Sequence, residues 1–336
     1  MRHTGMSPIV EAWSTCRTSN VLNWPADRLL QVKGQTTVSI VIPARDEEAT
    51  VGTIVTAIRT ALVQSVPLVD EVIVVDSRSV DETAASARAA GAFVVSQDDI
   101  TWGLPPMPGK GGAMWAGLAT ASGDIVAFVD ADVDPFDPRF VSGLLGPLLT
   151  DPSISFVKGF YHRPLRSGGY SEPDGGGRVT ELVARPLLNL FWPDLAGFVQ
   201  PLAGESAGRR ELLDRVPFVS GYGVETAMLV DLLELVGLDA LAQVDLGERT
   251  HRNQSNEALG QMAAQIQLTA WSRLARQGRV EATTKLPSVI TQFRRGGDQS
   301  LPNLDREIVI SDIGIDERPP LITVGLPRST PRTAAR

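Results

Sequence analysis

Short apolar runs, each ending in a polar loop that leads into a helical stretch, constrain the fold of this 336-residue chain more than any other feature. Residues 38–42 and 72–75 are such runs, and their valines and isoleucines predict strands buried on both faces. Residues 50–62 and the alanine-rich stretch that closes at Gly91 have helical spacing. Consecutive units of this kind give right-handed crossovers and a parallel sheet, with the ligand at the carboxyl ends of its strands. The predicted fold class is α/β, with a Rossmann-like, mostly parallel sheet flanked by helices.

Two further strands are predicted, and one of them ends at a pair of aspartates. Residues 93–95 form a short run, and residues 125–129 lead directly into Asp130 and Asp132. Side chains at i and i+2 of an extended chain point to the same side, so these carboxylates can share one hard cation. The loops at the same predicted sheet edge carry Asp46, Asp76, Lys110 and Asp130. Their convergence favours a site over the simpler explanation, a polar strand end.

Two glycine-rich segments predict anion binding. Residues 105–112 resemble a phosphate cradle only loosely, because the Walker pattern is not met, and a solvated Lys110 explains the segment equally well. Residues 175–177, with Arg178 and Thr180, precede an apolar helical run. Backbone N–H groups, a guanidinium and a hydroxyl at a helix N-terminus predict a seat for a phosphate or carboxylate. A flexible glycine loop is the common alternative.

Composition limits the classes of partner. The formal net charge of −8 argues against a general nucleic-acid or anionic-membrane partner, although it leaves room for a local basic pocket. The single cysteine, Cys16, excludes an internal disulfide. The sequence shows no basic-then-apolar leader and no uncharged apolar run near ~20 residues, so it predicts a cytoplasmic protein without a membrane span.

Several longer motifs resemble those of known enzymes. Four of them resemble the motifs of nucleotide-sugar glycosyltransferases with the GT-A fold, at residues 42–48, 75–83, 109–111 and 128–132. Five in the second half are similar to the glucosyl-3-phosphoglycerate synthase family, at residues 156–161, 175–186, 200–205, 221–225 and 249–253. The resemblance extends from residue 38 to about residue 274.

The resemblance implies a metal-dependent, retaining transferase. Such an enzyme moves glucose from UDP-glucose to the 2-hydroxyl of D-3-phosphoglycerate, giving glucosyl-3-phosphoglycerate, uses Mg²⁺ or Mn²⁺, and is a homodimer. The implied donor-binding residues are Pro43, Ala44, Arg45, Asp46, Glu47, Ser77, Lys110, Asp130, Leu202 and Arg249. The implied acceptor-binding residues are Gly177, Arg178, Thr180 and Asn253; the implied metal ligands are Asp132 and His251; and the implied catalytic residues are Glu225, Asp130 and Lys110.

Some of these assignments compete with simpler roles. Glu225 precedes a predicted helix at residues 227–236, where an acidic side chain also stabilises the helix N-terminus. By resemblance it instead binds the sugar hydroxyls. The sequence indicates no obvious second carboxylate nucleophile beside Glu225. This favours same-face attack by the acceptor hydroxyl, with the departing phosphate oxygen as base, over a covalent intermediate. A structural histidine is the alternative for His251. Asp46 stands where the family has asparagine, and Arg45 where it has an apolar residue.

Other functions remain open on the sequence. A mannosyl-3-phosphoglycerate synthase using GDP-mannose would share the acceptor loop, and a GT-A glycosyltransferase could take another acceptor. A sugar-phosphate nucleotidyltransferase would need a glycine-rich loop after the first strand, which residues 43–46 do not supply. A non-catalytic nucleotide-sugar-binding module would bind without turnover.

The chain is expected to divide into four segments. These are an N-terminal arm at 1–36, a nucleotide-sugar-binding half at 37–150, an acceptor-binding half at 151–275, and a C-terminal extension at 276–336. The arm has weak periodicity and is assigned no chemistry. Residues 308–310 predict a strand or a dimer contact, and the tail from about residue 329 has a disordered composition.

Overall fold

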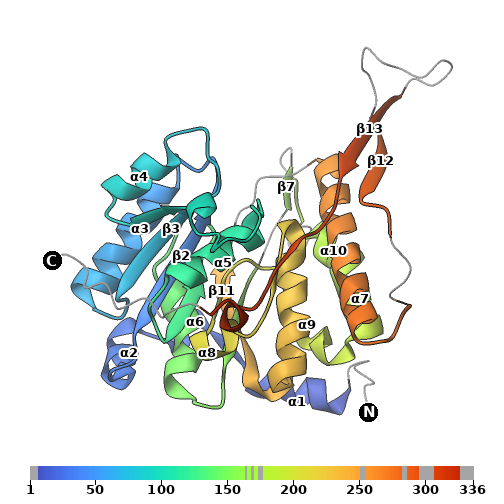
Figure 1. Ribbon diagram of the computed structural model, residues 1–336. Helices are drawn as coiled ribbons and strands as arrows, with labels where there is room; N and C mark the ends of the chain where they lie inside the picture. The colour runs from blue at the N-terminus through green and yellow to red at the C-terminus, as the bar shows by residue number, and fades with distance from the viewer. Residues whose placement is uncertain are drawn as a thin grey trace.

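The computed structural model is built around one eight-stranded sheet with the order β1-β11-β6-β9-β5-β2-β3-β4 (Figure 1). It describes residues 7–162, 165–167, 170–172, 177–249, 255–281, 286–294 and 306–325. The sheet strands are β1 (Thr18–Asn20), β2 (Val38–Ala44), β3 (Glu71–Asp76), β4 (Phe93–Ser96), β5 (Ile125–Phe128), β6 (Phe156–His162), β9 (Ser206–Arg209) and β11 (Leu241–Glu248).

Seven of the eight strands run parallel, and β9 alone is antiparallel to both of its neighbours, β5 and β6. The mostly parallel α/β sheet predicted from the sequence is therefore confirmed. Its four predicted strands are β2, β3, β4 and β5. The last of these ends at Phe128 rather than Val129, so the loop that carries the two aspartates begins one residue early.

Helices cover both faces of the sheet. Successive residues of a strand point to opposite faces, so each face carries apolar side chains that pack against helices. In β2, Ile40 and Ile42 pack into one core with α2, α3, α4 and α6, whereas Val41 packs into the other with α5, α9 and α10. Gly117 lets α5 lie close to β2, since a Cβ there would come within 2.2 Å of Val41 Cγ1. The described helices are α1 (Pro8–Cys16), α2 (Ala26–Lys33), α3 (Val51–Ile58), α4 (Thr83–Ala89), α5 (Lys110–Thr120), α6 (Arg139–Thr150), α7 (Arg185–Phe191), α8 (Arg210–Leu213), α9 (Val224–Val236) and α10 (Asn256–Arg276).

Shorter turns of helix extend several of these elements. The helix predicted at 50–62 is α3, which continues as the π-helical segment η2 (Arg59–Ser65). A second π-helical segment, η4 (Thr180–Ala184), precedes α7. The 3-10 turns are η1 (Val21–Asn23), η3 (Gln97–Asp99), η5 (Pro193–Gly197), η6 (Gly221–Gly223), η7 (Leu238–Ala240) and η8 (Leu321–Thr323). None of the helices in the described ranges is long and apolar enough to cross a membrane.

The N-terminal arm contributes to the sheet, which the sequence did not indicate. Its strand β1 pairs in parallel with β11 at the sheet edge. Trp13 in α1 secures the arm, since its Nε1 donates to the carbonyl of Leu241 at 2.8 Å and its ring centroid lies 4.7 Å from that of Phe198. β1 has three residues and no apolar alternation, so only its partner strand reveals it.

The C-terminal extension is also partly built into the fold. β12 (Val289–Arg294) and β13 (Glu307–Asp312) form an antiparallel ribbon that projects from the body (Figure 1), which confirms the strand predicted at 308–310. β14 (Glu317–Arg318) then pairs with β10 (Phe218–Val219). A third two-stranded sheet joins β7 (Leu165–Ser167) and β8 (Tyr170–Glu172). The tail predicted to be disordered from residue 329 lies outside the described residues.

Candidate active site

The loops that follow β2 and β3 are joined to each other, as expected for one sheet edge. The backbone N–H of Asp46 donates to Ser79 Oγ at 3.0 Å, and the Asp46 carboxylate accepts the N–H of Val80 at 2.8 Å. The N–H of Glu47 donates to Thr83 Oγ1 at 2.7 Å. These bonds hold the two predicted donor loops together as one surface.

Asp46 itself has a structural reason to stand where the family has asparagine. Its φ is +56°, a left-handed conformation that aspartate and asparagine tolerate better than other non-glycine residues. Either side chain also offers an oxygen to accept the Val80 N–H. The exposed side chain of Arg45 approaches Asp46, with Arg45 Nε at 3.7 Å from the carboxylate. Asp46 therefore preserves the backbone arrangement of this loop.

Four other predicted donor residues lie in two places. Pro43 and Ala44 end β2, and the Ala44 carbonyl accepts the N–H of the buried Ser77 at 2.8 Å, so these three residues lie beside the joined loops. Leu202 lies elsewhere, because it packs against a small apolar cluster that contains Val179. The structure thus places Leu202 near the predicted acceptor segment.

The three predicted catalytic residues come together around one ammonium group. Lys110 is the first residue of α5, and its Nζ lies 2.6 Å from Asp130 Oδ1 and 2.9 Å from Glu225 Oε1. Burial lowers the pKa of Lys110, but the carboxylates of Asp130 and Glu225 outweigh burial and raise that pKa above its ordinary value. Lys110 is therefore a stable cation at the carboxyl end of β5.

One expectation about Glu225 concerns its neighbours. The sequence indicated no obvious second carboxylate nucleophile beside it, and in the structure Asp130 and Glu225 contact the same Lys110 Nζ. The two residues lie 95 positions apart in a sequence that shows neither their shared partner nor the path that α9 takes back to the sheet. Asp130 is thus a neighbouring carboxylate, held by cationic groups.

Arg249 joins the two aspartates of the loop after β5. Its Nη2 lies 2.6 Å from Asp132 Oδ1, and its Nη1 lies 3.6 Å from Asp130 Oδ2 and 2.8 Å from Glu205 Oε1. Burial lowers the pKa of the guanidinium, but the three carboxylates raise it above its ordinary value. Asp130 and Asp132 therefore do meet at one cationic group, which here is Arg249.

The predicted metal site is only partly described. His251 lies outside the described residues, and within them no group of three or more His, Cys, Asp or Glu side chains is arranged to hold a metal ion. Asp132 has a side chain that is 56% exposed, and it offers oxygen ligands of the kind that Mg²⁺ and Mn²⁺ prefer. The chemistry of this residue fits a hard divalent cation.

Glycines shape the centre of the site. A Cβ on Gly204 would lie 2.2 Å from the Asp130 carboxylate and 2.4 Å from Lys110 Nζ, so a side chain there would disrupt the ion pair. A Cβ on Gly111 would lie 1.8 Å from the carbonyl oxygen of Val219, and one on Gly112 would meet the carbonyl of Met107 at 2.0 Å. Close packing at the start of α5 accounts for Gly111 and Gly112. The loosely predicted phosphate cradle stays a prediction.

The predicted acceptor segment lies beside α10. Gly177 has φ +76°, which favours glycine, and helical structure begins directly after it. Arg178 Nη1 donates to Asn256 Oδ1 at 2.9 Å, and Thr180 is buried. Asn253 lies outside the described residues. This segment is therefore ordered by the N-terminal turn of α10.

Sequence reasoning assigned no role to two charged residues that the structure places in this site. Glu205 is buried against Arg249, and Lys158 lies in β6 with 2% of its surface exposed. The signal for Lys158 was present, because it interrupts a strand whose other residues, 156–161, are apolar or glycine. The partner of Glu205 is 44 residues away, so the sequence held no signal for it.

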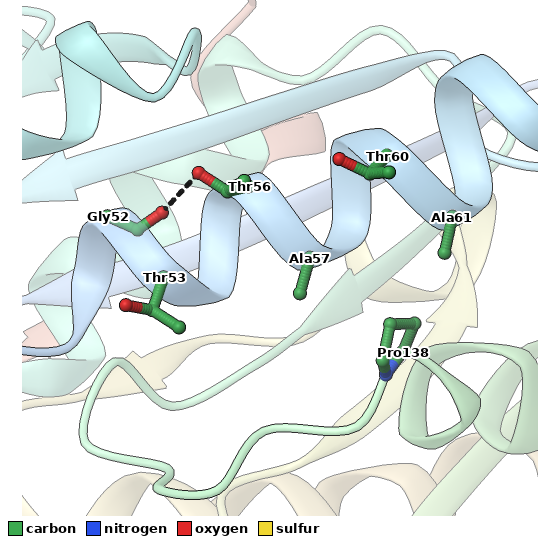
Figure 2. A pocket seen from close by; sticks show the side chains of 7 residues that line it. All are labelled: Gly52, Thr53, Thr56, Ala57, Thr60, Ala61 and Pro138. Atoms are coloured by element: carbon green, nitrogen blue, oxygen red, sulfur yellow. Dashed lines mark hydrogen bonds between the residues drawn. The ribbon is translucent and has the colours of Figure 1, made fainter.

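A separate groove lies between α3 and the loop before α6. Figure 2 shows its lining, which comes from one side of α3 and η2 and from Pro138. The lining residues are Gly52, Thr53, Thr56, Ala57, Thr60, Ala61 and Pro138. None carries a charge, and none belongs to the charged cluster, so the groove is not part of the candidate active site.

Known proteins that are similar to this chain identify its family. Residues 39–215 match the model of glycosyl transferase family 2. The glucosyl-3-phosphoglycerate synthase of Mycolicibacterium smegmatis is 47% identical over 312 residues, which cover 93% of this chain and 98% of that protein. The chain belongs to the glucosyl-3-phosphoglycerate synthase family. The synthase of Petrotoga mobilis is 40% identical over 295 residues, which cover 88% of this chain and 89% of that protein.

Solved structures agree over most of the chain. Glucosyl-3-phosphoglycerate synthase from Mycobacterium tuberculosis, in complex with Mn²⁺, UDP and glucosyl-3-phosphoglycerate, is 43% identical with a TM-score of 0.75 and covers 89% of this chain and 96% of that one. Mannosyl-3-phosphoglycerate synthase from Rubrobacter xylanophilus is 40% identical with a TM-score of 0.85 and covers 94% and 99%. The expected GT-A fold is thereby confirmed, and the family is one of glycosyltransferases.

Proposed function

We propose that this chain is a retaining glucosyltransferase that moves glucose from UDP-glucose to the 2-hydroxyl of D-3-phosphoglycerate. The observation that supports this most is the convergence of Lys110, Asp130 and Glu225 beside the Arg249–Asp132 pair, in a chain of this family. The synthase from M. tuberculosis has been crystallised with Mn²⁺, UDP-glucose and phosphoglyceric acid.

The donor would lie on the first half of the chain, residues 37–150. Pro43, Ala44 and Ser77 border the surface on which the uridine would sit, and Asp46 and Glu47 hold that surface together. Lys110 is a partly buried, permanently charged donor of hydrogen bonds, suited to a diphosphate oxygen. Asp130 would then face the ribose and sugar side of the donor.

A divalent cation, Mg²⁺ or Mn²⁺, completes this proposal. Asp132 and His251 would hold it, because carboxylate oxygen and imidazole nitrogen both suit Mn²⁺ and are tolerated by Mg²⁺. When bound, it neutralises the charge that grows on the leaving diphosphate. Asp132 already carries an ion pair with Arg249, so Arg249 would have to share or release that carboxylate.

The acceptor would lie on the second half, residues 151–275. Backbone N–H groups near Gly177, with Arg178 and Thr180, would bind the phosphate or carboxylate of 3-phosphoglycerate, together with Asn253. Arg178 is held by Asn256 at the start of α10. This contact would fix the guanidinium before the acceptor arrives.

Glu225 would orient the hexose through hydrogen bonds to its hydroxyls. The acceptor oxygen then attacks the anomeric carbon from the face that the diphosphate leaves. The new carbon–oxygen bond forms as the old one breaks, and the proton passes to the departing phosphate oxygen. Asp130 is the other nearby carboxylate, but its ion pairs with Lys110 and Arg249 withdraw charge from it. These pairs disfavour a covalent glycosyl-enzyme intermediate on Asp130.

A second candidate function is mannosyl transfer from GDP-mannose to the same acceptor. The similarity to the mannosyl-3-phosphoglycerate synthase structure favours it, since that structure has the higher TM-score of the two described above. A GT-A glycosyltransferase with another acceptor remains a third candidate.

We also propose that the protein is a cytoplasmic homodimer, with the β12–β13 ribbon in the contact. Phe293 pairs with Ile308, and Thr291 with Ile310, so the apolar members of these pairs lie on one face of the ribbon. Phe293 is 62% exposed and Ile310 68%. A soluble monomer rarely leaves such side chains grouped on one face. Sedimentation of the Phe293→Ser variant should then show monomer.

Turnover assays test the proposed reaction. Nucleotide diphosphate release would be measured with 3-phosphoglycerate and Mg²⁺ or Mn²⁺, using UDP-glucose, GDP-glucose and GDP-mannose as donors, and the anomeric form of the product would be read by NMR. We expect transfer from UDP-glucose with retention. Preferential transfer from GDP-mannose would select the second candidate. No transfer to 3-phosphoglycerate from any donor would refute the assigned acceptor.

A further inference from the structure

Lys158 occupies a position in the sheet where an apolar residue would be expected. It lies in β6 and pairs with Ser206 of β9, which pairs on its other side with Phe128 of β5. Paired residues point to the same face, so Lys158 lies on the face that carries Phe128 and is covered by α5 and α9. Only 2% of its surface is exposed. Its side chain therefore extends from the sheet toward the first residues of α5 and α9, where Lys110 and Glu225 lie.

Charged groups face Lys158 from four directions, yet none of them pairs with it. They are Glu225 from α9, Lys110 from α5, Glu205 before β9 and Asp130 after β5. On β11, the neighbouring residue in register is the neutral Gln243. No described residue forms a hydrogen bond or an ion pair with the Lys158 ammonium. Burial lowers its pKa to about 8, and the carboxylates only partly offset that effect.

The chain contains a second buried lysine for comparison. Lys33 in α2 is 8% exposed, but its Nζ lies 2.7 Å from Asp70. A buried ammonium is costly unless a carboxylate lies next to it, and Lys33 meets that requirement. Lys158 does not meet it, although a methionine would fill the same space without the cost. This difference indicates that the charge of Lys158 is needed at a step when its surroundings change.

Donor binding is such a step. Within the described residues, the ion pair of Glu225 is to Lys110, which also holds Asp130. A diphosphate oxygen that takes a hydrogen bond from Lys110 competes with both carboxylates. Glu225 is 7% exposed, so loss of that pair would leave a buried carboxylate without its counter-charge. Among the described residues, Lys158 is a further cation that faces it.

We propose that Lys158 is a positioning residue, whose ammonium keeps Glu225 ionised and turned toward the hexose once the donor diphosphate engages Lys110. This rests on the proposed function, since Glu225 is taken to bind the sugar. Lys158 acts through Glu225 and does not touch the reacting atoms. The buried charge of Lys158 thus takes effect when the donor is bound.

The Lys158→Met variant tests the proposal, with Lys33→Met as the matched control for loss of a buried lysine. We expect Lys158→Met to lower kcat by about 10- to 100-fold while the donor KM stays within about threefold. The acid limb of the kcat profile should move to higher pH, because the site loses a cation that faces its carboxylates. The unfolding temperature should not fall. Lys33→Met should lower the unfolding temperature and leave the acid limb unchanged.

Other outcomes would overturn the proposal. A Lys158→Met variant with wild-type kcat and acid limb would do so, as would one that unfolds more easily and loses activity without a shift of that limb. Titration of ¹³C-labelled glutamate by NMR, with UDP and Mn²⁺ present and with Glu225→Gln to assign the signal, measures the Glu225 pKa without turnover. If no donor is turned over with 3-phosphoglycerate, the proposed function fails, whereas an unchanged Glu225 titration in Lys158→Met sinks the role of Lys158.

Discussion

Helix α9 takes part in two buried charge clusters that differ in one respect. Near its start, Glu225 shares Lys110 with Asp130. Farther along the same helix, Asp231 faces α10 and meets Arg273, and both side chains are 3% exposed. The first cluster lies at the carboxyl ends of the strands, and the second lies away from the sheet edge. The two clusters differ in how completely their charges are paired.

The Asp231 cluster is saturated, in the sense that its charged groups have close partners of opposite charge. Arg273 Nε and Nη2 lie 3.1 and 2.7 Å from the two oxygens of Asp231, in a bidentate pair. Arg273 also binds Glu317, and Arg276 binds Asp231. Burial lowers the pKa of Arg273, but these carboxylates raise it above its ordinary value. Such a cluster joins α9, α10 and β14 and has no position left for a ligand.

The active-site cluster is not saturated. Lys110 contacts two carboxylates, and Arg249 contacts three without the bidentate geometry of the Arg273–Asp231 pair. Asp132 is more than half exposed, and Lys158 has no close partner in the described part of the chain. Charges that are buried but shared can be redistributed when a ligand arrives. The contrast suggests that the degree of pairing distinguishes a binding cluster from a structural one.

The largest effect should come from breaking the saturated cluster. Asp231→Asn leaves the buried Arg273 with one carboxylate fewer, and we expect the free energy of unfolding to fall by about 3–5 kcal/mol. Urea denaturation measures it. The folded variant should keep its kcat, because Asp231 does not face the site. Asp98→Asn, which breaks the exposed pair with Arg78, should cost less than about 1 kcal/mol.

Glu225→Gln should instead lower activity and leave stability almost unchanged. The amide keeps the size of the side chain but loses the charge that we propose orients the hexose, so kcat should fall by about 10²–10³-fold with little change in unfolding temperature. Steady-state kinetics and thermal unfolding measure both. Glu234→Gln, on the exposed side of the same helix, is the control and should keep full activity. An active Glu225→Gln variant would remove Glu225 from the catalytic set.

The stability of the protein should depend on pH through Lys158. Its pKa is lowered from the ordinary 10.5 to about 8, mainly by burial. Below pH 8 the lysine is protonated in both the folded and the unfolded chain. Between pH 8 and 10.5 the unfolded chain binds more protons, so folding stability rises with pH. The advantage of Lys158→Met over wild type should therefore shrink by on the order of 3 kcal/mol across that range. An advantage that stays constant in urea titrations would contradict this.

The smallest predicted effect concerns Asp132. Asp132→Asn removes the charge of a proposed ligand at an exposed position, and we expect Mn²⁺ affinity in the presence of UDP to weaken by about tenfold or more. Electron paramagnetic resonance of free Mn²⁺ measures it, and chelation of the metal should abolish turnover. Asp137→Asn, in the same loop, pairs only locally with Arg139 and should bind Mn²⁺ normally. Equal affinity in both variants would rule out Asp132 as a ligand.

Much of the fold follows from local patterns, whereas parts of the site do not. The strands at 38–42 and 72–75 were predictable because buried parallel strands are continuous apolar runs. The edge strand β1 was not, because its three polar residues are recognisable only beside β11. In the same way, the motif around Asp130 predicted a site, but the role of Glu205 depends on a partner 44 residues away.

The sequence by itself determined the α/β class, the sheet edge that carries the site, and the residue types gathered there, because strand periodicity and the position of loops after strands are local properties. Only the tertiary structure decided which charges meet. Arg249 reaches Asp132 across 117 residues, and Lys158 has no ion pair within the described residues, although carboxylates from three other segments act on it. Ion pairing and desolvation depend on distance in space, and distance along the chain does not report it.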